Sequence, residues 1–291
     1  MLRYTGSAAV DYSNSPNCEA VGADTLDFII RPDFTRDQRS PFTVHARPCP
    51  PPPNPLVRKL EQFSRLEDGD IQSLDKLVAL PKAMRAGQLL VHDNSVLDQV
   101  FLIIQGMGCR YKLLPGGERQ ILGYLIPGDL CDIHFITLTK PDHSVALVSE
   151  SQVIKIPTQK LDALLASNPR IERALSLAGL HDIAILREWL LNVGQRNAVQ
   201  KLSHFFCEMM IRLSRIGQVS DDGSFELPIN QMALADTTGL TPVHINRTLQ
   251  RLRSDGLIRL CQRRLFIIDP ARLAAVAGFD DSYLQINQCK R

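Results

Sequence analysis

The sequence predicts an α+β chain with three parts: an antiparallel β-roll (jelly-roll-like) domain, a long dimerisation helix and a winged helix-turn-helix domain. Three observations lead to this prediction. Residues 82–157 hold short β-rich runs between turn residues, residues 169–192 have the period of one long helix, and residues 231–253 read as two short helices joined at Gly239. A chain of 291 residues, 44% of them apolar, is long enough for two domains with real cores.

The composition excludes several classes of protein. The formal net charge is only +2, so any surface for a nucleic acid must be local. The polar N-terminal sequence MLRYTGSAAVDYSNS is no signal peptide, and no apolar run reaches the roughly 18 residues of a membrane span. We therefore expect a cytoplasmic protein without a membrane partner. The seven cysteines are scattered and form no CxxC pair, which in the cytoplasm favours free thiols.

Residues 1–53 are predicted to be a disordered, Pro-rich extension. They are rich in Ser, Asp, Asn and Pro, and they end in the run Pro50–Pro53, which favours a stiff and extended spacer. A regulatory tail, a partner-binding segment and an extension without a selected role are all compatible with this composition.

The β-roll domain is predicted to span residues 54–166. It begins with two helices over residues 54–80, which we expect to be separated by Asp68-Gly69-Asp70. Strands are then predicted at Gln88–Val91, Val100–Gln105, Cys109–Leu114, Gln120–Leu125, Ser144–Val148 and Val153–Ile156. Turn residues such as Pro115-Gly116-Gly117 and Pro127-Gly128-Asp129 separate these strands, and this regular spacing is typical of a small antiparallel roll.

The dimerisation helix is predicted over residues 167–196, with Pro169 in its first turn. It is apolar on two sides. One side carries Ile171, Leu175, Ala178, Ile185 and Trp189, and the other carries Leu177, Leu180, Ala184 and Leu191. Because one β-roll has too little surface to cover both sides, we expect one side to pack on the same helix of a second subunit as a coiled coil. The alternative is a helix that is buried within one subunit.

The winged helix-turn-helix domain is predicted over residues 197–278, and a C-terminal tail follows at residues 279–291. Thr241 is a suitable N-cap for the second helix of the motif, and Pro242 is a suitable first residue. The apolar residues that hold the two helices together are predicted to be Ala235, Ile245, Leu249 and Leu252. A β-hairpin within Leu257–Ile268 would form the wing.

Basic side chains cluster around the second helix. They are Arg247, Arg251, Arg253, Arg259, Arg263 and Arg264, with Asp255 as the one nearby acidic residue. DNA affinity depends largely on the neutralisation of phosphates, so this cluster favours DNA binding over a plain amphipathic helical hairpin. The second helix would then lie in a DNA major groove.

Seven short motifs follow one another in a fixed order. They are Pro127-Gly128-Asp129-Leu130, Leu202–Glu208, Leu227–Gln231, Leu234-Ala235-Asp236, Gly239-Leu240-Thr241, Asn246–Leu252 and Asp255–Ile258. Together they resemble the Crp/Fnr superfamily of bacterial transcription regulators, over residues 54–278. The resemblance implies a homodimer that binds a palindromic double-stranded DNA operator, with half-sites about 10 base pairs apart, and that has RNA polymerase as a further partner.

The resemblance also implies roles for single residues. Arg247 would donate to O6 and N7 of a guanine, while Gln231 and Thr241 would hold phosphates. Val243 and His244 lie where relatives often have Glu and Ser, so we expect an operator that differs from that of the best-known members. The complete set of candidate DNA-binding residues is Gln231, Thr241, Val243, His244, Asn246, Arg247, Gln250 and Arg251.

The turn Gly128-Asp129-Leu130 resembles the effector-binding turn of the family's cyclic-AMP members. However, Lys140–Ser144 lacks the Arg that holds the cyclic phosphate there, and a buried phosphate without a cation is unfavourable. Cys18 and Cys49 are too isolated to supply the ligands of an iron–sulfur cluster. A haem ligand would have to come from isolated residues, namely His92, His134, His143 or Cys109. We therefore predict no cofactor, whether cyclic nucleotide, haem or iron–sulfur cluster.

Two other functions compete with DNA-dependent regulation. One is an effector-binding module that responds to a cyclic nucleotide or haem and has an altered DNA-binding role. The other is an enzyme, but the sequence shows no nucleophile–base motif, phosphate loop or His/Glu cluster, so we predict no catalytic residue and no metal site. A redox-reactive thiol at Cys207 or Cys261 stays open.

Overall fold

The structure is a computed structural model that describes residues 54–78, 80–131 and 140–284. The predicted Pro-rich extension at residues 1–53 and the end of the predicted C-terminal tail, residues 285–291, lie outside the described residues.

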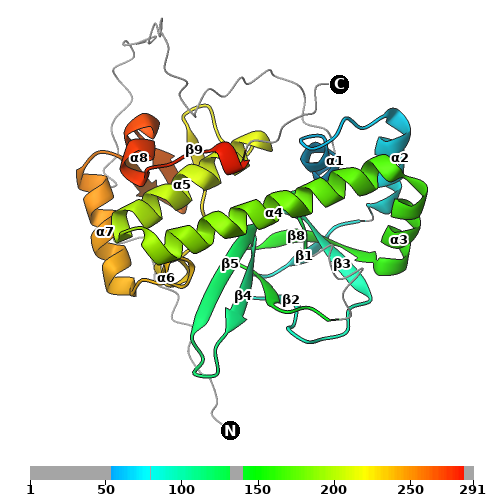
Figure 1. The fold of residues 1–291 in the computed structure, drawn as a ribbon, viewed down its shortest axis with the longest axis horizontal. Coiled ribbons are helices and arrows are strands. Elements are labelled where there is room, and N and C mark those ends of the chain that lie inside the picture. Colours follow the sequence, from blue (N-terminus) through cyan, green and yellow to red (C-terminus); the bar gives the residue numbers. More distant parts are fainter. Residues whose placement is uncertain (1–53, 79, 132–139, 285–291) are drawn as a thin grey trace, which may run out of the picture.

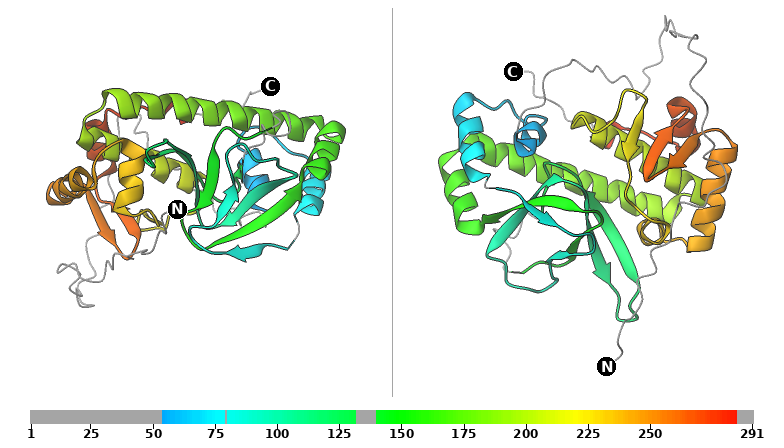
Figure 2. Two further views of the ribbon diagram at one scale, coloured as in Figure 1. Left: turned by 90° about the horizontal axis from the view of Figure 1, so that it is seen from below. Right: turned by 180° about the vertical axis from the view of Figure 1, so that it is seen from behind.

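One long helix, α4 (Pro169–Gln195), organises the described part of the chain. It runs along the whole molecule, with the β-roll beside one half and the helix-turn-helix domain beside the other (Figure 1). Figure 2 shows from two further sides that both domains lie on the same side of this helix. The opposite side of α4 is therefore left uncovered by either domain.

Two short helices precede the β-roll: α1 (Pro55–Leu60) and α2 (Asp68–Leu77). Asn54 begins α1, because its side-chain oxygen accepts a hydrogen bond from the Leu56 N–H at 3.0 Å. The predicted break at Asp68-Gly69-Asp70 is wrong. These residues form the first turn of α2, where Asp70 accepts a hydrogen bond from the Glu67 N–H at 2.9 Å and thus stabilises the helix start.

The β-roll consists of two four-stranded antiparallel sheets, with strand orders β1-β8-β3-β6 and β2-β7-β4-β5. The strands are β1 (Lys82–Met84), β2 (Leu89–Val91), β3 (Gln99–Gln105), β4 (Gly108–Leu113), β5 (Arg119–Leu125), β6 (Leu130–Cys131), β7 (Ser144–Leu147) and β8 (Ser151–Pro157). All six predicted strands are present to within two residues at either end. The short strands β1 and β6, and the helix α3 (Thr158–Ser167) that follows β8, were not predicted.

The two sides of α4 differ as the sequence predicts. Ile171, Leu175, Ala178, Ile185 and Trp189 are all buried against the chain's own domains. On the other side, Leu180 is 62% exposed and Leu191 is 46% exposed. Among the described residues, this second side of α4 is therefore only partly covered.

The C-terminal domain combines helices with a three-stranded antiparallel sheet of order β10-β11-β9. Its elements are α5 (Ala198–Arg215), β9 (Ser224–Glu226), α6 (Gln231–Thr238), α7 (Pro242–Ser254), β10 (Ile258–Cys261), β11 (Arg264–Ile267), α8 (Pro270–Ala277) and a 3-10 helix (Ser282–Leu284). The strands β10 and β11 form the predicted wing. The segment after α8 is packed, because Phe279 and Tyr283 contact the buried His204 ring at centroid distances of 5.0 and 5.9 Å.

The two domains share one hydrophobic core. Tyr124 of β5, Trp189 of α4 and Phe205 of α5 contact one another with ring centroids 5.5–6.0 Å apart. Each of these side chains is at least 95% buried, and the same core continues to Ile245 and Leu249 of α7. The position of α7 is thus tied to the β-roll through continuous apolar packing.

Candidate DNA-binding surface

The turn between α6 and α7 is built by local backbone chemistry. α6 ends at Gly239, whose φ of +66° is a left-handed conformation that glycine adopts without strain. Thr241 then caps α7, because its hydroxyl accepts a hydrogen bond from the His244 N–H at 3.3 Å. Pro242 occupies the first turn of the helix, where a missing N–H has no effect. These residues fix the start of α7 and therefore the direction of its outer face.

The inner face of α7 is apolar and buried. Ile245, Leu249 and Leu252 are at most 3% exposed, and Ala235 of α6 is 5% exposed. This arrangement confirms the predicted packing between the two helices. The small Ala235 side chain lets α6 and α7 approach closely, so α7 is held along its length.

The outer face of α7 brings most of the predicted DNA-binding residues together. Those that lie exposed on it or at its N-cap are Thr241, Val243, His244, Asn246, Arg247, Gln250 and Arg251. Arg247 projects away from the protein, and no ion pair engages it within the described residues. The remaining residue, Gln231, is half-buried at the first position of α6.

The basic cluster divides into free and engaged side chains. Arg264 supports the sheet, because its guanidinium donates to the hydroxyls of Ser220 and Ser224, each at 2.7 Å. Arg259 stacks over the Phe266 ring at 4.1 Å. In contrast, Arg263 is exposed at the tip of the wing. The sequence pattern did not separate these roles, since the partners of Arg264 come from a loop about 40 residues upstream.

The wing ends in a tight turn at Gln262 and Arg263, with φ angles of +48° and +62°. Residues other than glycine and asparagine rarely adopt this left-handed backbone conformation. Each such residue lowers the stability of the fold by about 1 kcal/mol. The turn places Arg263 at the outermost point of the hairpin. The sequence predicts a hairpin within Leu257–Ile268, but the strain at Arg263 is visible only in the backbone.

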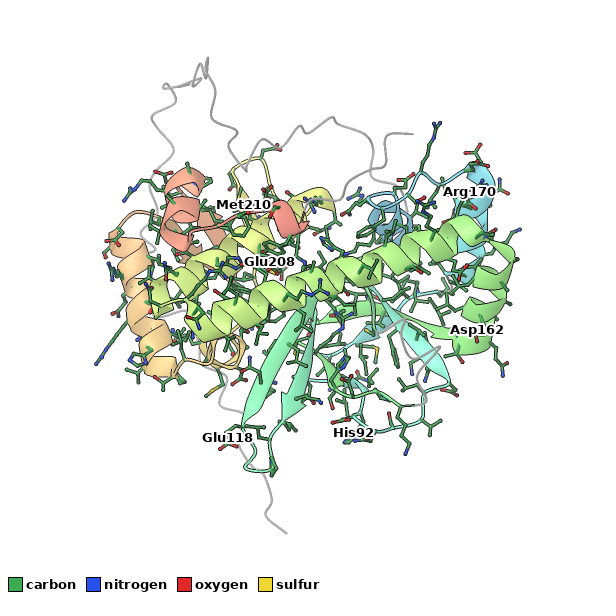
Figure 3. All side chains as sticks on the ribbon, viewed as in Figure 1. His92, Glu118, Asp162, Arg170, Glu208 and Met210 are labelled. Carbon is green, nitrogen blue, oxygen red and sulfur yellow. The ribbon has the colours of Figure 1, made fainter. Side chains whose placement is uncertain are left out.

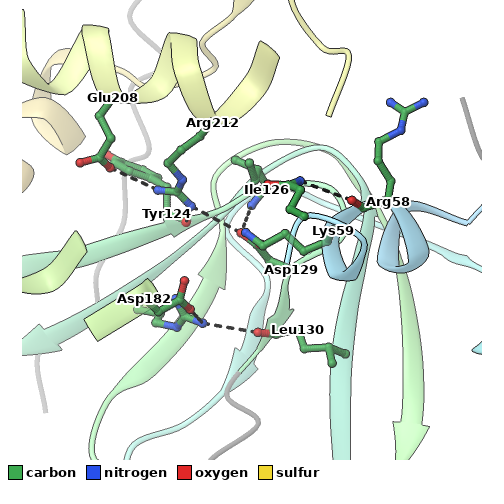
Figure 4. Close-up of polar contacts among 11 residues, drawn as sticks. Arg58, Lys59, Tyr124, Ile126, Asp129, Leu130, Asp182, Glu208 and Arg212 are labelled. Carbon is green, nitrogen blue, oxygen red and sulfur yellow. Dashed lines mark hydrogen bonds and ion pairs between the residues drawn. The ribbon is translucent and has the colours of Figure 1, made fainter. Parts of the chain in front are cut away.

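The predicted effector turn is buried beneath α1. Gly128 has a φ of +93°, and a Cβ atom there would lie 2.5 Å from the carbonyl oxygen of Pro55, so only glycine fits. The Asp129 carboxylate lies 2.7 Å from the Lys59 ammonium and 3.5 Å from the Arg212 guanidinium (Figure 4). Burial alone would raise the pKa of Asp129, but these two cations outweigh it and hold the pKa below its usual value.

The space beside this turn is small. The cavity lined by Gly128, Asp129 and Leu130, together with residues of α1 and α4, has a volume of about 20 Å³, which is enough for about one water molecule. In this conformation the turn therefore faces the protein's own side chains.

The candidate cofactor ligands do not converge. His92 is exposed, and its ring nitrogen lies 2.6 Å from the Asp93 carbonyl oxygen, while His143 pairs with Asp142 at 2.8 Å. Burial raises the pKa of the Cys109 thiol to about 11. Among the residues that the structure describes, no three His, Cys, Asp or Glu side chains are arranged to hold a metal ion. Cys18, Cys49 and His134 lie outside these residues.

Two further expectations concern a redox-reactive thiol and a membrane-spanning helix. Cys207 is fully buried in α5, and burial raises its pKa, which makes the thiol unreactive. Cys261 is half-buried in the wing. In the described ranges, none of the helices has the length and apolar character that crossing a bilayer requires.

Two family descriptions match separate parts of the chain. Residues 81–168 match the cyclic nucleotide-binding domain, and residues 200–276 match the Crp-like helix-turn-helix domain. These ranges coincide with the β-roll and with the domain that carries α6 and α7.

Several curated regulators are similar over most of the chain. The transcriptional activatory protein AadR of Rhodopseudomonas palustris is 26% identical over 224 residues, which are 76% of this chain and 91% of AadR. The nitrogen fixation regulation protein FixK of Bradyrhizobium diazoefficiens is 24% identical over 66% of this chain and 80% of FixK. The transcriptional activator protein anr of Pseudomonas aeruginosa is 25% identical over 72% of this chain and 85% of anr.

Solved structures share the fold. FixK2 from Bradyrhizobium japonicum superimposes with a TM-score of 0.63, at 20% identity over 70% of this chain and 100% of that one. The regulator TTHB099 from Thermus thermophilus has a TM-score of 0.55, at 18% identity over 68% of this chain and 97% of that one. With both domains matched in order, and with α7 presenting the predicted polar face, the chain belongs to the Crp/Fnr superfamily of DNA-binding transcription regulators.

Proposed function

We propose that the protein binds a palindromic operator as a homodimer and reads base edges in the major groove with the outer face of α7. The observation that carries this proposal is the position of Arg247. It is exposed on α7 while Ile245 and Leu249, on the opposite face, hold the helix in place. A guanidinium fixed in this way can donate two hydrogen bonds to O6 and N7 of one guanine.

The uncovered side of α4 supports the homodimer. It carries five large apolar side chains that are between 38% and 75% exposed: Leu180, Ile183, Leu186, Leu190 and Leu191. The first four are three or four residues apart, and Leu191 lies eleven residues, or about three helical turns, after Leu180, so all five fall on one side of the helix. An exposed stripe of this length is typical of a surface that packs on another protein, and a second copy of α4 is the partner that matches it. Pairing of two α4 helices would place two α7 helices on successive turns of DNA, about 10 base pairs apart.

The other residues of α7 define the remaining contacts that we propose. Val243 is 59% exposed and could pack on a thymine methyl group, while His244 and Asn246 present hydrogen-bonding groups to the same groove. Thr241 at the N-cap and Gln231 at the start of α6 would hold phosphates, because N–H groups at helix starts favour anions. Gln250 and Arg251 would extend the contact along the backbone.

The β-roll would act as a sensor of an unidentified signal. We propose that no cyclic nucleotide, haem or iron–sulfur cluster is resident, which the small cavity beside Asp129 and the lack of an Arg in residues 140–144 support. We also propose a cytoplasmic regulator that contacts RNA polymerase and has no enzymatic activity. The alternative is an effector module for cyclic nucleotides, favoured by the family match over residues 81–168. A rise in melting temperature with added cyclic AMP or cyclic GMP would support that alternative.

Selection from a library of random DNA duplexes tests the proposed function. The full-length protein should enrich one palindromic sequence, and dimers should bind it. Arg247→Ala should then lose about 1–3 kcal/mol of binding free energy for this duplex and relax the preference at one base pair of each half-site. Arg173→Ala, which removes an exposed guanidinium from α4, is the matched control. If the wild type enriches no sequence, the proposal is wrong, and if Arg247→Ala binds as well as the control, the base contact is wrongly assigned.

A further inference from the structure

The short helix α1 contacts both domains, although it is only six residues long. Its Lys59 ammonium reaches the Asp129 carboxylate in the β-roll at 2.7 Å. The next residue towards the N-terminus, Arg58, donates to the carbonyl oxygen of Ile216 at the end of α5. Figure 4 shows these two side chains leaving α1 in different directions. α1 is therefore a bridge between the β-roll and the DNA-binding domain.

A series of ionisable side chains, which we name the interdomain charge chain, continues from this bridge. Asp129 follows Lys59, and the Arg212 guanidinium of α5 lies 3.5 Å from the Asp129 carboxylate. Arg212 also donates to the Tyr124 carbonyl oxygen of β5 at 2.8 Å and to the Glu208 carboxyl group at 3.3 Å. The interdomain charge chain thus comprises Lys59, Asp129, Arg212 and Glu208, and it joins α1, the β-roll and α5.

Glu208 extends the connection to two more elements. Glu208 lies on the side of α5 that faces α4 (Figure 3). Its carboxyl group accepts hydrogen bonds from the Trp189 indole N–H and from the Tyr283 hydroxyl, both at 3.0 Å. Burial raises the pKa of Glu208 against the opposing effect of Arg212. The chain therefore ends on α4, the helix that carries the exposed apolar stripe.

All four members of the interdomain charge chain are buried. Their exposed fractions are 7% for Lys59, 7% for Asp129, 6% for Arg212 and 0% for Glu208. Separation of a buried ion pair leaves charges that neither water nor a partner compensates, which is strongly unfavourable. The DNA-binding domain consequently cannot rotate away from the β-roll unless Asp129 and Arg212 part. The ion pair therefore makes one orientation of the DNA-binding domain more stable than other nearby orientations.

A palindromic operator makes this orientation important. A single α7 can bind one half-site in any orientation of its domain, whereas two α7 helices can bind both half-sites only when both domains are held at the right angle. A mobile domain would lose affinity for the full palindrome, because the binding-competent arrangement would be populated only part of the time.

We infer that the interdomain charge chain positions the DNA-binding domain for two-site binding, and that α1 holds this chain in place through Lys59 and Arg58. This inference rests on the proposed function, because it requires a palindromic operator. It makes Lys59, Arg58 and Asp129 positioning residues for DNA recognition, although they lie away from the face that meets DNA. It also means that the operator affinity can be altered from the N-terminal side of the β-roll.

Binding of the full-length protein to three duplexes tests the inference. The duplexes are the palindrome that the wild type enriches from a random library, a single half-site and a random sequence of equal length. Lys59→Met should weaken binding to the palindrome about five- to tenfold or more, while the other two affinities stay the same. Lys59→Arg should restore much of the palindrome affinity, because it restores a cation. Lys76→Met on α2, where the lysine is exposed, is the matched control.

Arg58→Gln provides a second variant that leaves the buried charges untouched. It should also weaken binding to the palindrome, and it should raise hydrogen exchange at the end of α5 around Ile216. Equal affinity of Lys59→Met, Arg58→Gln and the wild type for the palindrome would overturn the inference. So would a loss that is equal on all three duplexes, or a gain in palindrome affinity. If the wild type enriches no palindrome, the proposed function is wrong. This result is distinct from the outcomes that would overturn the inference.

Discussion

Arg119 of β5 donates a hydrogen bond from Nε to the Asp236 carboxylate of α6 at 2.8 Å, and its Nη2 lies 2.7 Å from the same oxygen. This ion pair fastens the first helix of the helix-turn-helix motif to the hairpin formed by β4 and β5. Next to it, the Tyr124 hydroxyl and the Thr237 hydroxyl are 2.8 Å apart. The hairpin tip, marked by Glu118, points away from α4 (Figure 3). The β-roll thus contacts the DNA-binding domain at α6 as well as at α5.

The Arg119–Asp236 pair should stabilise the contact between domains to a measurable but modest extent. Its side chains are 34% and 18% exposed, so solvent weakens the attraction. A double-mutant cycle of Arg119→Gln and Asp236→Asn should give a coupling energy of about 0.5–1 kcal/mol in urea denaturation. The same cycle with Glu118→Gln in place of Asp236→Asn should give a coupling near zero. A coupling near zero for Arg119 and Asp236 would show that the pair adds nothing to stability.

The exposed stripe of α4 should control the oligomeric state. Leu190 is 75% exposed at the centre of the stripe's C-terminal half. In a two-fold interface one substitution changes both subunits, and each buried leucine contributes about 1.5–3 kcal/mol. Leu190→Asp should therefore raise the dimer dissociation constant by about a hundredfold or more, as measured by analytical ultracentrifugation.

Val96→Asp is the matched control for the dimer. Val96 is 83% exposed, but it lies in the β-roll and far from α4 in sequence. This variant should remain dimeric. A dimeric Leu190→Asp variant would show that the subunits associate through another surface.

The elements with strong local signals were predictable from the sequence. Ile245, Leu249 and Leu252 recur at helical spacing, and Thr241 with Pro242 marks a helix start, so the buried face of α7 follows from the order of residues alone. The six predicted strands of the β-roll follow from local sequence for the same reason. Likewise, the helical period separates the two apolar sides of α4. In the part of the chain that the structure describes, one side is buried and the other is largely exposed.

The features that depend on distant partners were not predictable. β6 has two residues, and it pairs with β3 nearly thirty positions away, so its own sequence carries almost no signal. Asp129 stands in a recognisable turn, but its buried pairing with Lys59 depends on where α1 packs. Similarly, Arg264 belongs to a basic cluster by sequence and to the Ser220–Ser224 loop in space. Composition shows which groups are charged, whereas only the fold shows which charges are already engaged.

Arg263 at the wing tip should be useful for DNA binding and unfavourable for stability. Its φ of +62° is strained for a side-chain-bearing residue. Arg263→Gly should therefore raise the free energy of unfolding by about 1 kcal/mol. The same change should weaken binding to all DNA sequences. It should also make the negative slope of log K against log salt concentration shallower by about 1, because one phosphate contact is lost.

Gln262→Gly separates the two effects in the wing. Gln262 has a φ of +48°, so glycine should relieve similar strain and stabilise the fold. No cation is lost, and both the DNA affinity and its salt dependence should match those of the wild type. An unchanged salt slope for Arg263→Gly would mean that the wing does not reach a phosphate.

The buried His204 should make the protein less stable in mild acid. Its ring is fully buried between Phe279 and Tyr283, with the Glu188 carboxylate 3.3 Å from Nε2. Burial, helped by the positive charge of Arg196, lowers the pKa of His204 to about 3, whereas the unfolded chain has the ordinary value of 6.5. Above pH 6.5 both states are neutral. Between pH 6.5 and about 3 the unfolded chain takes up a proton that the folded protein excludes, so stability falls as the pH falls.

His204→Phe should reduce this loss, because the phenyl ring keeps the contacts with Phe279 and Tyr283 and carries no proton. Each pH unit in the window is worth up to about 1.4 kcal/mol per histidine. Urea denaturation at about pH 7.5 and about pH 5.5 should therefore show a drop in the free energy of unfolding that is about 1 kcal/mol smaller for the variant than for the wild type. His181, whose pKa burial lowers to about 4, should contribute a similar drop in both proteins, so it cancels in the comparison. An equal drop in the two proteins would mean that His204 gains a proton in the folded state, which would require the packing around Phe279 and Tyr283 to open.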